Sequence, residues 1–168
     1  MTLIRARPRV RGLIGESAAR PDGVPKVKGE FLYASDLAER GMLVGHTLRS
    51  PHPHARIRAI DTTRASRMPG VHAVLVNRDL PTRALFGLMK RDQPVLAEGV
   101  VRYVGEPVAL VAADDIEQAR EAARAIVVEY EPLPAVTDPI VALRPDAPKV
   151  HPDGNVIDSV RVVHGDPR

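Results

Sequence analysis

The chain has 168 residues, enough for one domain with its own core; 44% of them are hydrophobic but only 3% aromatic, so we expect an interior of Val, Leu, Ile and Ala. Cys is absent, which excludes disulfides, thiolate nucleophiles, zinc–thiolate sites and cysteine-ligated iron–sulfur clusters within this chain. Residues 1–28 hold seven Lys and Arg against two Asp and Glu, a net charge of +5. The whole chain has a net charge of +3, so the remaining residues carry −2. Because the body of the chain is not basic, the basic pI does not predict nucleic-acid binding.

The basic segment lacks interleaved aromatic residues, and we interpret residues 1–23 as a flexible or partner-docked arm. We expect one domain over residues 24–168, whose last residues form a linker or tail, because prolines are scattered and no internal repeat occurs. The N-terminal segment lacks the apolar run of a secretory signal, and no stretch approaches the roughly 18 apolar residues that span a bilayer. We therefore expect a cytoplasmic address and no membrane span.

Short strands are predicted in the first part of the chain. Residues 29–34 have a strand-like composition, and residues 36–41 are typical of a turn. Residues 42–49 alternate with period two, and His46 falls on the more apolar face of the predicted strand. In residues 55–61, alanine and isoleucine alternate with arginine, which predicts a strand with one buried and one wet face.

The middle of the chain predicts two buried strands. One or two helical turns over residues 62–68 end at Pro69-Gly70, and the apolar run of residues 71–76 has the length of a buried strand. Residues 77–93 are mixed and predict a loop-rich segment. Residues 108–113 open with five consecutive apolar residues, which exceeds an alternating pattern and predicts a strand buried on both faces.

The clearest helix follows that strand. Either Asp114 with Glu117 or Asp115 with Gln118 has the spacing of an N-terminal capping box, and the sequence leaves both open. An alanine-rich apolar face predicts close packing of the helix onto a sheet, and its members are Ile116, Ala119, Ala122, Ala123 and Ile126. A strand over residues 126–131 comes next, so residues 108–131 predict a crossover unit.

Two histidines in a proline-rich turn are candidate metal ligands. An H-x-H pair such as His52 and His54, in an extended segment, places both imidazoles on one side, a spacing that metal sites use. No carboxylate follows or precedes the pair directly, and histidines in such turns commonly bond to backbone and set the loop shape. We favour a packing and interface role for the pair over metal binding.

Glu106 is a candidate general base, because the neighbouring Gly105 permits close approach of a substrate and burial would raise the pKa of a glutamate. A base needs a partner group and a pocket, and neither a Ser-His-Asp nor a Lys-Tyr arrangement is evident nearby. We favour a carboxylate that shapes a turn. Gly87 and Gly105 are isolated glycines, so no phosphate-binding loop is predicted.

Five strings of residues, in a fixed order along the chain, carry a resemblance. They are Val27-Lys28-Gly29 with Phe31-Leu32-Tyr33-Ala34-Ser35-Asp36, then Leu48-Arg49-Ser50-Pro51-His52 with His54-Ala55-Arg56-Ile57, then Asp92-Gln93-Pro94-Val95-Leu96-Ala97, then Val101-Arg102-Tyr103-Val104-Gly105-Glu106-Pro107-Val108-Ala109, and finally Val128-Glu129-Tyr130-Glu131-Pro132-Leu133-Pro134. In these strings the chain resembles the xanthine dehydrogenase and aldehyde oxidase family of molybdenum hydroxylases. It departs from the family at Lys28, where threonine is usual, and at Pro53, where alanine is usual.

The resemblance implies an α+β fold, a single α/β-hammerhead-like domain with a mixed sheet and few helices, which opens the molybdopterin-binding large subunit. In the family, the molybdopterin loops and the general-base glutamate follow this domain, so we expect no catalytic, cofactor-binding or metal-binding residue here. The string residues that we take as candidates for structural or interface roles are Arg49, Ser50, Pro51, His52, His54, Arg56, Gln93, Tyr103, Gly105, Glu106 and Pro107.

By the same resemblance, the chain is a hammerhead module or split subunit of a molybdenum-dependent hydroxylase or dehydrogenase. It would scaffold the cofactor domains and dock partner subunits while the enzyme hydroxylates aldehydes or N-heteroaromatics. The implied partners are a molybdopterin-binding catalytic chain and iron–sulfur subunits, with a flavin (FAD) subunit in many members. Two alternatives stay open: a non-catalytic assembly or interaction factor for such an enzyme, and an autonomous hydrolase or metal enzyme that uses the histidines and Glu106.

Overall fold

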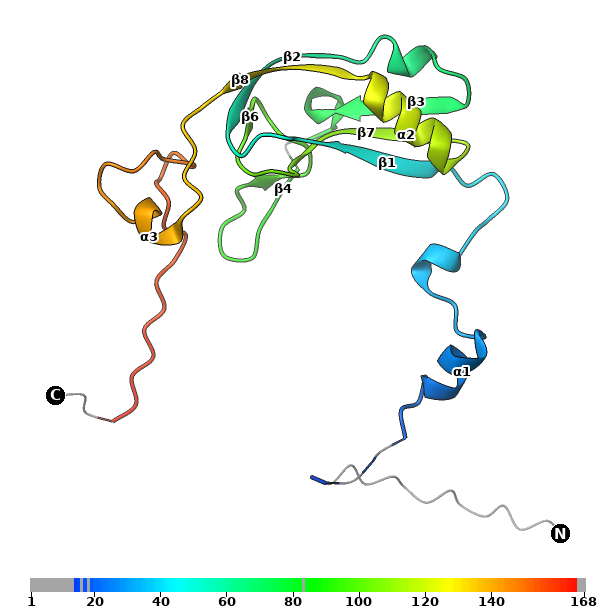
Figure 1. Ribbon diagram of the computed structural model, residues 1–168, viewed down its shortest axis with the longest axis horizontal. Helices are drawn as coiled ribbons and strands as arrows, with labels where there is room; N and C mark the ends of the chain where they lie inside the picture. The colour runs from blue at the N-terminus through cyan, green and yellow to red at the C-terminus, as the bar shows by residue number, and fades with distance from the viewer. Residues whose placement is uncertain (1–13, 16, 18, 83, 166–168) are drawn as a thin grey trace. The chain divides into compact units, whose positions relative to one another are not determined.

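The structure is a computed structural model that describes residues 14, 15, 17, 19–82 and 84–165 (Figure 1). Its contacts divide the chain into two compact units, one ending at Arg40 and one beginning at Gly41. Most of the predicted arm, residues 1–23, lies outside the described residues, so its flexibility stays a prediction. The predicted domain boundary at residue 24 also stays a prediction. The division at Gly41 reflects which residues contact one another and does not test where the hammerhead domain begins.

The first unit contains a short helix just before residues 29–34, where a strand is predicted and none forms. Helix α1 (Gly23–Lys28) ends at Gly29, whose φ of 71° is left-handed, and Glu30 N donates to Pro25 O at 2.9 Å. This closure satisfies the last carbonyls of the helix and turns the chain, so the next residues do not extend into a strand. A 3-10 turn, η1 (Ala34–Asp36), follows. The strand prediction is therefore wrong.

The second unit is built on a sheet whose central strand is β7 (Pro107–Ala113). It pairs with β1 (Val44–Arg49) on one side and β3 (Val71–Val76) on the other, so the strand order is β1-β7-β3. Because both edges of β7 are taken and α2 packs on it, its side chains are mostly buried, as its unbroken apolar run predicts. The predicted strands at residues 42–49, 71–76 and 108–113 are confirmed, with small shifts at their ends.

A second sheet has the order β6-β2-β8, formed by β6 (Val100–Val101), β2 (Ala55–Asp61) and β8 (Val127–Pro132). A two-stranded hairpin of β4 (Leu85–Phe86) and β5 (Gln93–Pro94) completes the strands. Every pair between these strands is antiparallel. The strands predicted over residues 55–61 and 126–131 are confirmed as β2 and β8.

The predicted crossover unit is wrong, because β7 and β8 belong to different sheets. A crossover unit returns the chain to the sheet that it left. Here β1 and β3 already occupy both edges of β7, and β8 instead pairs with β2, from Ala55 opposite Pro132 to Asp61 opposite Val127. The predicted order of strand, helix and strand is confirmed, whereas the prediction that both strands belong to one sheet is wrong.

Helix α2 (Ile116–Ala125) begins at the second of the two predicted caps. The Asp115 side chain accepts a hydrogen bond from Gln118 N at 2.9 Å, whereas Asp114 contacts the ring of His72. Three alanines, Ala119, Ala122 and Ala123, are buried where the helix packs on β1 and β7. The alanine face is thus confirmed, although Ile116 of the same predicted face is exposed in the first turn.

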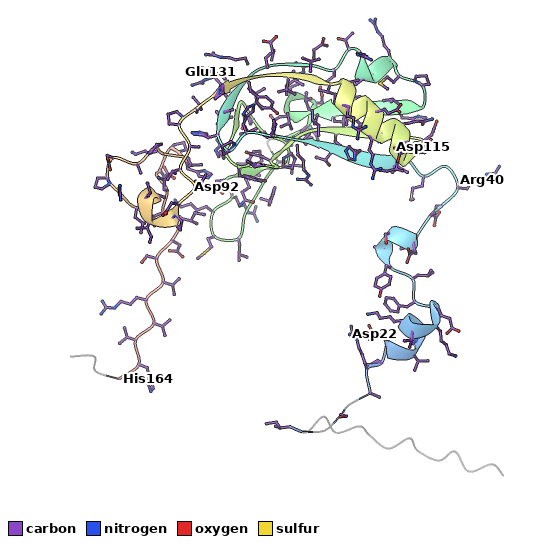
Figure 2. The ribbon with its side chains drawn as sticks, in the orientation of Figure 1. Asp22, Arg40, Asp92, Asp115, Glu131 and His164 are labelled. Carbon is purple, nitrogen blue, oxygen red and sulfur yellow. The ribbon has the colours of Figure 1, made fainter. Side chains whose placement is uncertain are left out.

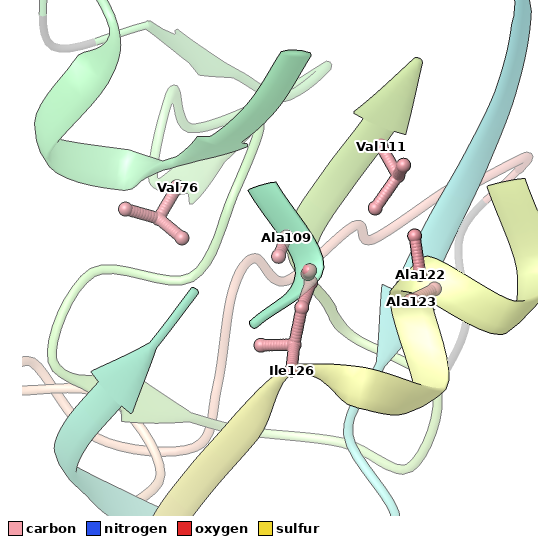
Figure 3. Packing of buried hydrophobic residues seen from close by; sticks show 7 residues of the cluster. Val76, Ala109, Val111, Ala122, Ala123 and Ile126 are labelled. Atoms are coloured by element: carbon pink, nitrogen blue, oxygen red, sulfur yellow. The ribbon is translucent and has the colours of Figure 1, made fainter. Parts of the chain in front are cut away.

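Figure 3 shows the main core, in which α2 meets the first sheet through small side chains. The buried members are Ala65, Val76, Ala109, Val111, Ala122, Ala123 and Ile126. A smaller buried cluster lies at the second sheet and contains Ala55, Ala97, Val101 and Val108. The largest fully buried side chains are valines, so the predicted aliphatic core is confirmed, and Tyr130 packs against the smaller cluster from its edge.

Short helical turns connect the strands. A single 3-10 turn, η2 (Ala65–Arg67), lies within the predicted turn at residues 62–68, and η3 (Asn77–Asp79) opens the predicted loop-rich segment. Helix α3 (Pro139–Ala142) was not predicted; Asp138 caps it by accepting from Ile140 N and Val141 N. Among the helices of the described residues, none has the length and apolarity needed to cross a bilayer.

Candidate functional site

The histidine turn joins β1 to β2 and is locked by a buried serine. The Ser50 hydroxyl accepts a hydrogen bond from His52 N at 3.0 Å and donates one to His52 O at 3.1 Å. Ser50 is almost fully buried, so both bonds are shielded from water. With Pro51 and Pro53 limiting the backbone, the serine gives the turn a defined shape.

The two histidine rings have different neighbours. His52 packs edge-on against Tyr130 of β8, with ring centroids 4.8 Å apart. His54 is buried, and its Nδ1 lies 2.6 Å from Pro134 O, so this nitrogen carries the proton and donates it. In the described part of the chain, no group of three or more His, Asp or Glu side chains is placed to hold a metal ion. The contacts of the two rings with Tyr130 and Pro134 O support the packing role.

A second turn, residues 102–106 between β6 and β7, lies directly against the histidine turn. Ser50 N donates to Glu106 O at 2.9 Å, and Gly105 N donates to Ser50 O at 2.8 Å. The Arg49 guanidinium adds a bond from Nη1 to Gly105 O at 2.8 Å. Pro107 begins β7 opposite Arg49, and its carbonyl accepts from Ala97 N. The fold therefore brings together five of the candidate residues that the sequence places in two separate strings.

Glu106 is 2% exposed and is the buried carboxylate of this cluster. Its Oε2 accepts a hydrogen bond from Arg102 N, so the side chain closes its own turn. Burial raises the pKa of Glu106, while the Arg102 hydrogen bond and guanidinium charge oppose that rise. This geometry supports the interpretation of a turn-shaping carboxylate over that of a general base.

A small cavity of about 80 Å³ beside Glu106 brings in two further candidates, Gln93 and Tyr103. An adjoining opening of about 290 Å³ shares Asp92, Arg102 and His151 with it. Asp92 Oδ2 and His151 Nδ1 are 3.6 Å apart. Lys90 and Asp153 form a similar pair in the larger opening, also at 3.6 Å. These two contacts join the β4–β5 hairpin to residues 151–157, and Arg91 and Arg102 also line the larger opening.

Arg56 makes its contacts on the second sheet. Its Nε is 3.5 Å from Glu131 Oε2, and Arg58 contacts the same carboxylate; Glu131 is labelled on β8 in Figure 2. Both arginines are about half exposed, so each pair is expected to contribute less than about 1 kcal/mol. The arginine is therefore a surface residue of β2.

Sequence reasoning missed four residues of this region: Asp92, Arg102, His151 and Asp153. Asp92 and Arg102 lie inside the strings that carry the resemblance, so those strings were the available indication. His151 and Asp153 lie in a segment without periodicity or motif, and only the tertiary contacts reveal them. The role of Tyr130 was also missed: its ring contacts His52, and burial raises the pKa of its hydroxyl against a hydrogen bond with Ser50.

Comparison with known proteins gives a consistent result. Residues 28–134 match the family described as "Aldehyde oxidase and xanthine dehydrogenase, a/b hammerhead domain". This chain belongs to that family. The predicted resemblance and the α+β hammerhead fold with few helices are thereby confirmed.

Relatives of the hammerhead domain are components of molybdenum enzymes. The chain is 46% identical over 150 residues to a probable xanthine dehydrogenase subunit of Bacillus subtilis (strain 168), a match that covers 89% of this chain and 20% of that protein. It is 34% identical over 154 residues to the nicotinate dehydrogenase large molybdopterin subunit of Eubacterium barkeri, covering 92% of this chain and 36% of that protein.

Among solved structures, quinoline 2-oxidoreductase from Pseudomonas putida 86 superposes with a TM-score of 0.74 at 40% identity. The match covers 86% of this chain and 20% of that one. The hammerhead domain described here therefore spans between about a fifth and a third of the length of these relatives.

Proposed function

We propose that this hammerhead domain is a module of a molybdenum hydroxylase, which braces the molybdopterin-binding domains and docks the iron–sulfur and flavin subunits while the enzyme hydroxylates an aldehyde or N-heteroaromatic substrate. One observation carries the proposal: the family match extends over residues 28–134 of a chain that corresponds to only 20% of the Bacillus subtilis relative. A module of this size complements, in such an enzyme, a much larger catalytic body.

The buried polar residues support a bracing role. Ser50, His54 and Glu106 are the buried polar or charged residues of the described chain, and all three belong to the candidate set. Each bonds to backbone: Ser50 to His52, His54 to Pro134, and Glu106 to Arg102. Groups used in this way make loops rigid, and rigid loops present a defined surface to a partner.

The residues present do not fit the redox groups of the proposed enzyme. An iron–sulfur cluster is held by cysteine thiolates, and this chain has none. The opening of about 290 Å³ has a mixed lining of Lys90, Arg91, Arg102 and His151 with Asp92 and Asp153. Lys90 and His151 each lie 3.6 Å from one of these acids, so the lining does not single out a site for a pterin phosphate. We assign both groups to partner chains or domains.

A chimera tests the proposal at full enzyme length. The matched segment of the Bacillus subtilis relative is replaced by residues 24–165 of this chain, and the chimera is produced together with its natural partner subunits. We expect it to incorporate molybdenum and to retain hydroxylation of its substrate, because the module folds as in its relative. The control is the Bacillus subtilis relative with the matched segment deleted, which is expected to hold little molybdenum.

A chimera that is produced and folded but acquires no molybdenum contradicts the proposal. Recovery of this chain with immature subunits only, and its release once the metal is inserted, favours the assembly-factor alternative. Hydroxylation by this chain without any partner would overturn the proposal that the catalytic groups lie on other chains or domains.

A further inference from the structure

The turn of the β4–β5 hairpin exposes a group of large apolar side chains. Leu88 is fully exposed, Met89 is 60% exposed and Phe86 is 52% exposed, three residues within four positions; we call them the apolar tip. Single exposed apolar residues are common on protein surfaces, whereas a cluster on a projecting turn marks an interaction site. In Figure 1 the loop that follows β4 extends away from the sheets of its unit.

The turn is built to hold this shape. Leu85 pairs with Pro94 and Phe86 with Gln93, and Val95 N donates to Ala84 O at 3.1 Å below them. Gly87 has a φ of 151°, and a Cβ at this position would lie 1.7 Å from Lys90 O. Only glycine permits the chain to close this tightly, so the tip projects from a defined turn.

The base of the hairpin contacts residues 151–157 of the same unit. Lys90 Nζ lies 3.6 Å from Asp153 Oδ2, and His151 Nδ1 lies 3.6 Å from Asp92 Oδ2. Leu85, Val156 and Ile157 line the opening between them. The turn therefore offers a partner the apolar tip with the exposed Arg91 beside it, and a surface complementary to the tip is an apolar pocket. Met and Phe are among the side chains enriched in protein interfaces.

We propose that the apolar tip inserts into an apolar pocket of the molybdopterin-binding body of the large subunit. This inference rests on the proposed function and names the contact. It is supported by size, since the chain corresponds to 20% of the Bacillus subtilis relative and the rest of such a protein offers most of the available surface. Continuity supports it too: the exposed Val160, Val162 and Val163 follow the segment that the hairpin contacts, so a second apolar stretch leads away from the same opening.

Hydrogen exchange of the chimera tests the contact directly. Amides of residues 86–92 are compared between the whole isolated chain and the assembled chimera. We expect exchange in the chimera to be at least about tenfold slower, and the substitution Leu88→Asp within the chimera to abolish most of this protection and to deprotect a peptide of the molybdopterin-binding body. The matched control is Val127→Asp, an exposed apolar position on β8, which should leave tip protection unchanged.

The outcomes separate the two proposals. If the chimera assembles with molybdenum but the tip exchanges as fast as in the isolated chain, the tip contact is overturned and the proposed function stands. If the chimera does not assemble, both are overturned. Protection that appears only when the iron–sulfur subunit is present assigns the tip to that subunit. Protection that grows with the concentration of the isolated chain assigns it to a second copy, and either result rejects the occupant proposed here.

Discussion

Ser50, His54 and Glu106 show how a few buried polar side chains determine the form of two neighbouring turns. Each satisfies backbone groups of a loop, and the two loops bond to each other through Ser50 and residues 105–106. Burial of a polar group is costly unless it is bonded, so replacement of any of these side chains leaves a donor or acceptor unpaired. These bonds give each of the three side chains a structural role.

Ser50→Ala is expected to lower the free energy of unfolding by about 1–2 kcal/mol, because His52 N loses its acceptor in a buried turn. The same substitution is expected to raise the pKa of Tyr130, since the hydrogen bond with Ser50 holds that pKa down. Denaturant unfolding and a spectrophotometric titration of tyrosine measure the two effects. Ser159→Ala, at an exposed position, is the control, and equal stability of both variants would contradict the assigned role of Ser50.

Glu106→Gln tests the effect of burial on the carboxyl. The folded-state pKa of Glu106 is raised, so the folded protein binds a proton more tightly than the unfolded chain does. The wild type should lose stability as pH rises from the unfolded value near 4.5 through the folded value, by about 1.4 kcal/mol for each tenfold change in the dissociation constant. The Gln variant should lack this loss.

The control for that experiment is Glu129→Gln, which removes an exposed carboxylate from β8. It is expected to retain the wild-type pH dependence of the free energy of unfolding. A Glu106→Gln variant whose stability falls with pH as steeply as the wild type would show that another group titrates in this window.

At the scale of elements, local patterns were sufficient where one force dominates. The period-two alternation predicted β1 and β2, and the apolar runs predicted β3 and β7. A strand buried on one face alternates apolar and polar residues, and a strand buried on both faces is apolar throughout. The strand predicted at residues 29–34 failed for a different reason. Its composition suits a strand, but Gly29 adopts the left-handed conformation that ends α1, and Lys26 packs 4.7 Å from the ring of Phe31.

The two capping boxes of α2 can be distinguished by substitution. Asp115→Ala is expected to cost about 1 kcal/mol in the free energy of unfolding, because the amide of Gln118 loses its acceptor at the helix N-terminus. Asp114→Ala removes only an exposed contact with His72 and should cost less than about 0.5 kcal/mol. Thermal and denaturant unfolding give both values, and a reversed order would return the cap to Asp114.

At the scale of the whole molecule, packing divides the chain at Gly41, whereas the family match begins at residue 28. The residues between these limits thus belong to the family by sequence and pack within their own unit. A family segment that packs within a unit of its own suits a role in contacts between domains of a larger enzyme, as the proposed function requires.

Two deletions test that division. Removal of residues 1–40 is expected to shift the thermal midpoint of the remaining unit by less than about 2 °C, because the elements that pack most closely with the sheets and α2 lie within the second unit. Removal of residues 1–23 should have no larger effect. A loss of cooperative unfolding in the longer deletion alone would show that residues 24–40 complete the core, as the predicted boundary at residue 24 requires.

The residue order alone determined the aliphatic core, the five main strands, the amphipathic helix and membership of the hammerhead family, because periodicity, caps and ordered motifs act between residues close in sequence. Tertiary structure decided which sheet receives β8, since that depends on β1 and β3 having taken both edges of β7. It also decided that His151 meets Asp92 and that the histidine turn meets Glu106. These contacts join distant segments, and no local pattern encodes the free energy of bringing them together.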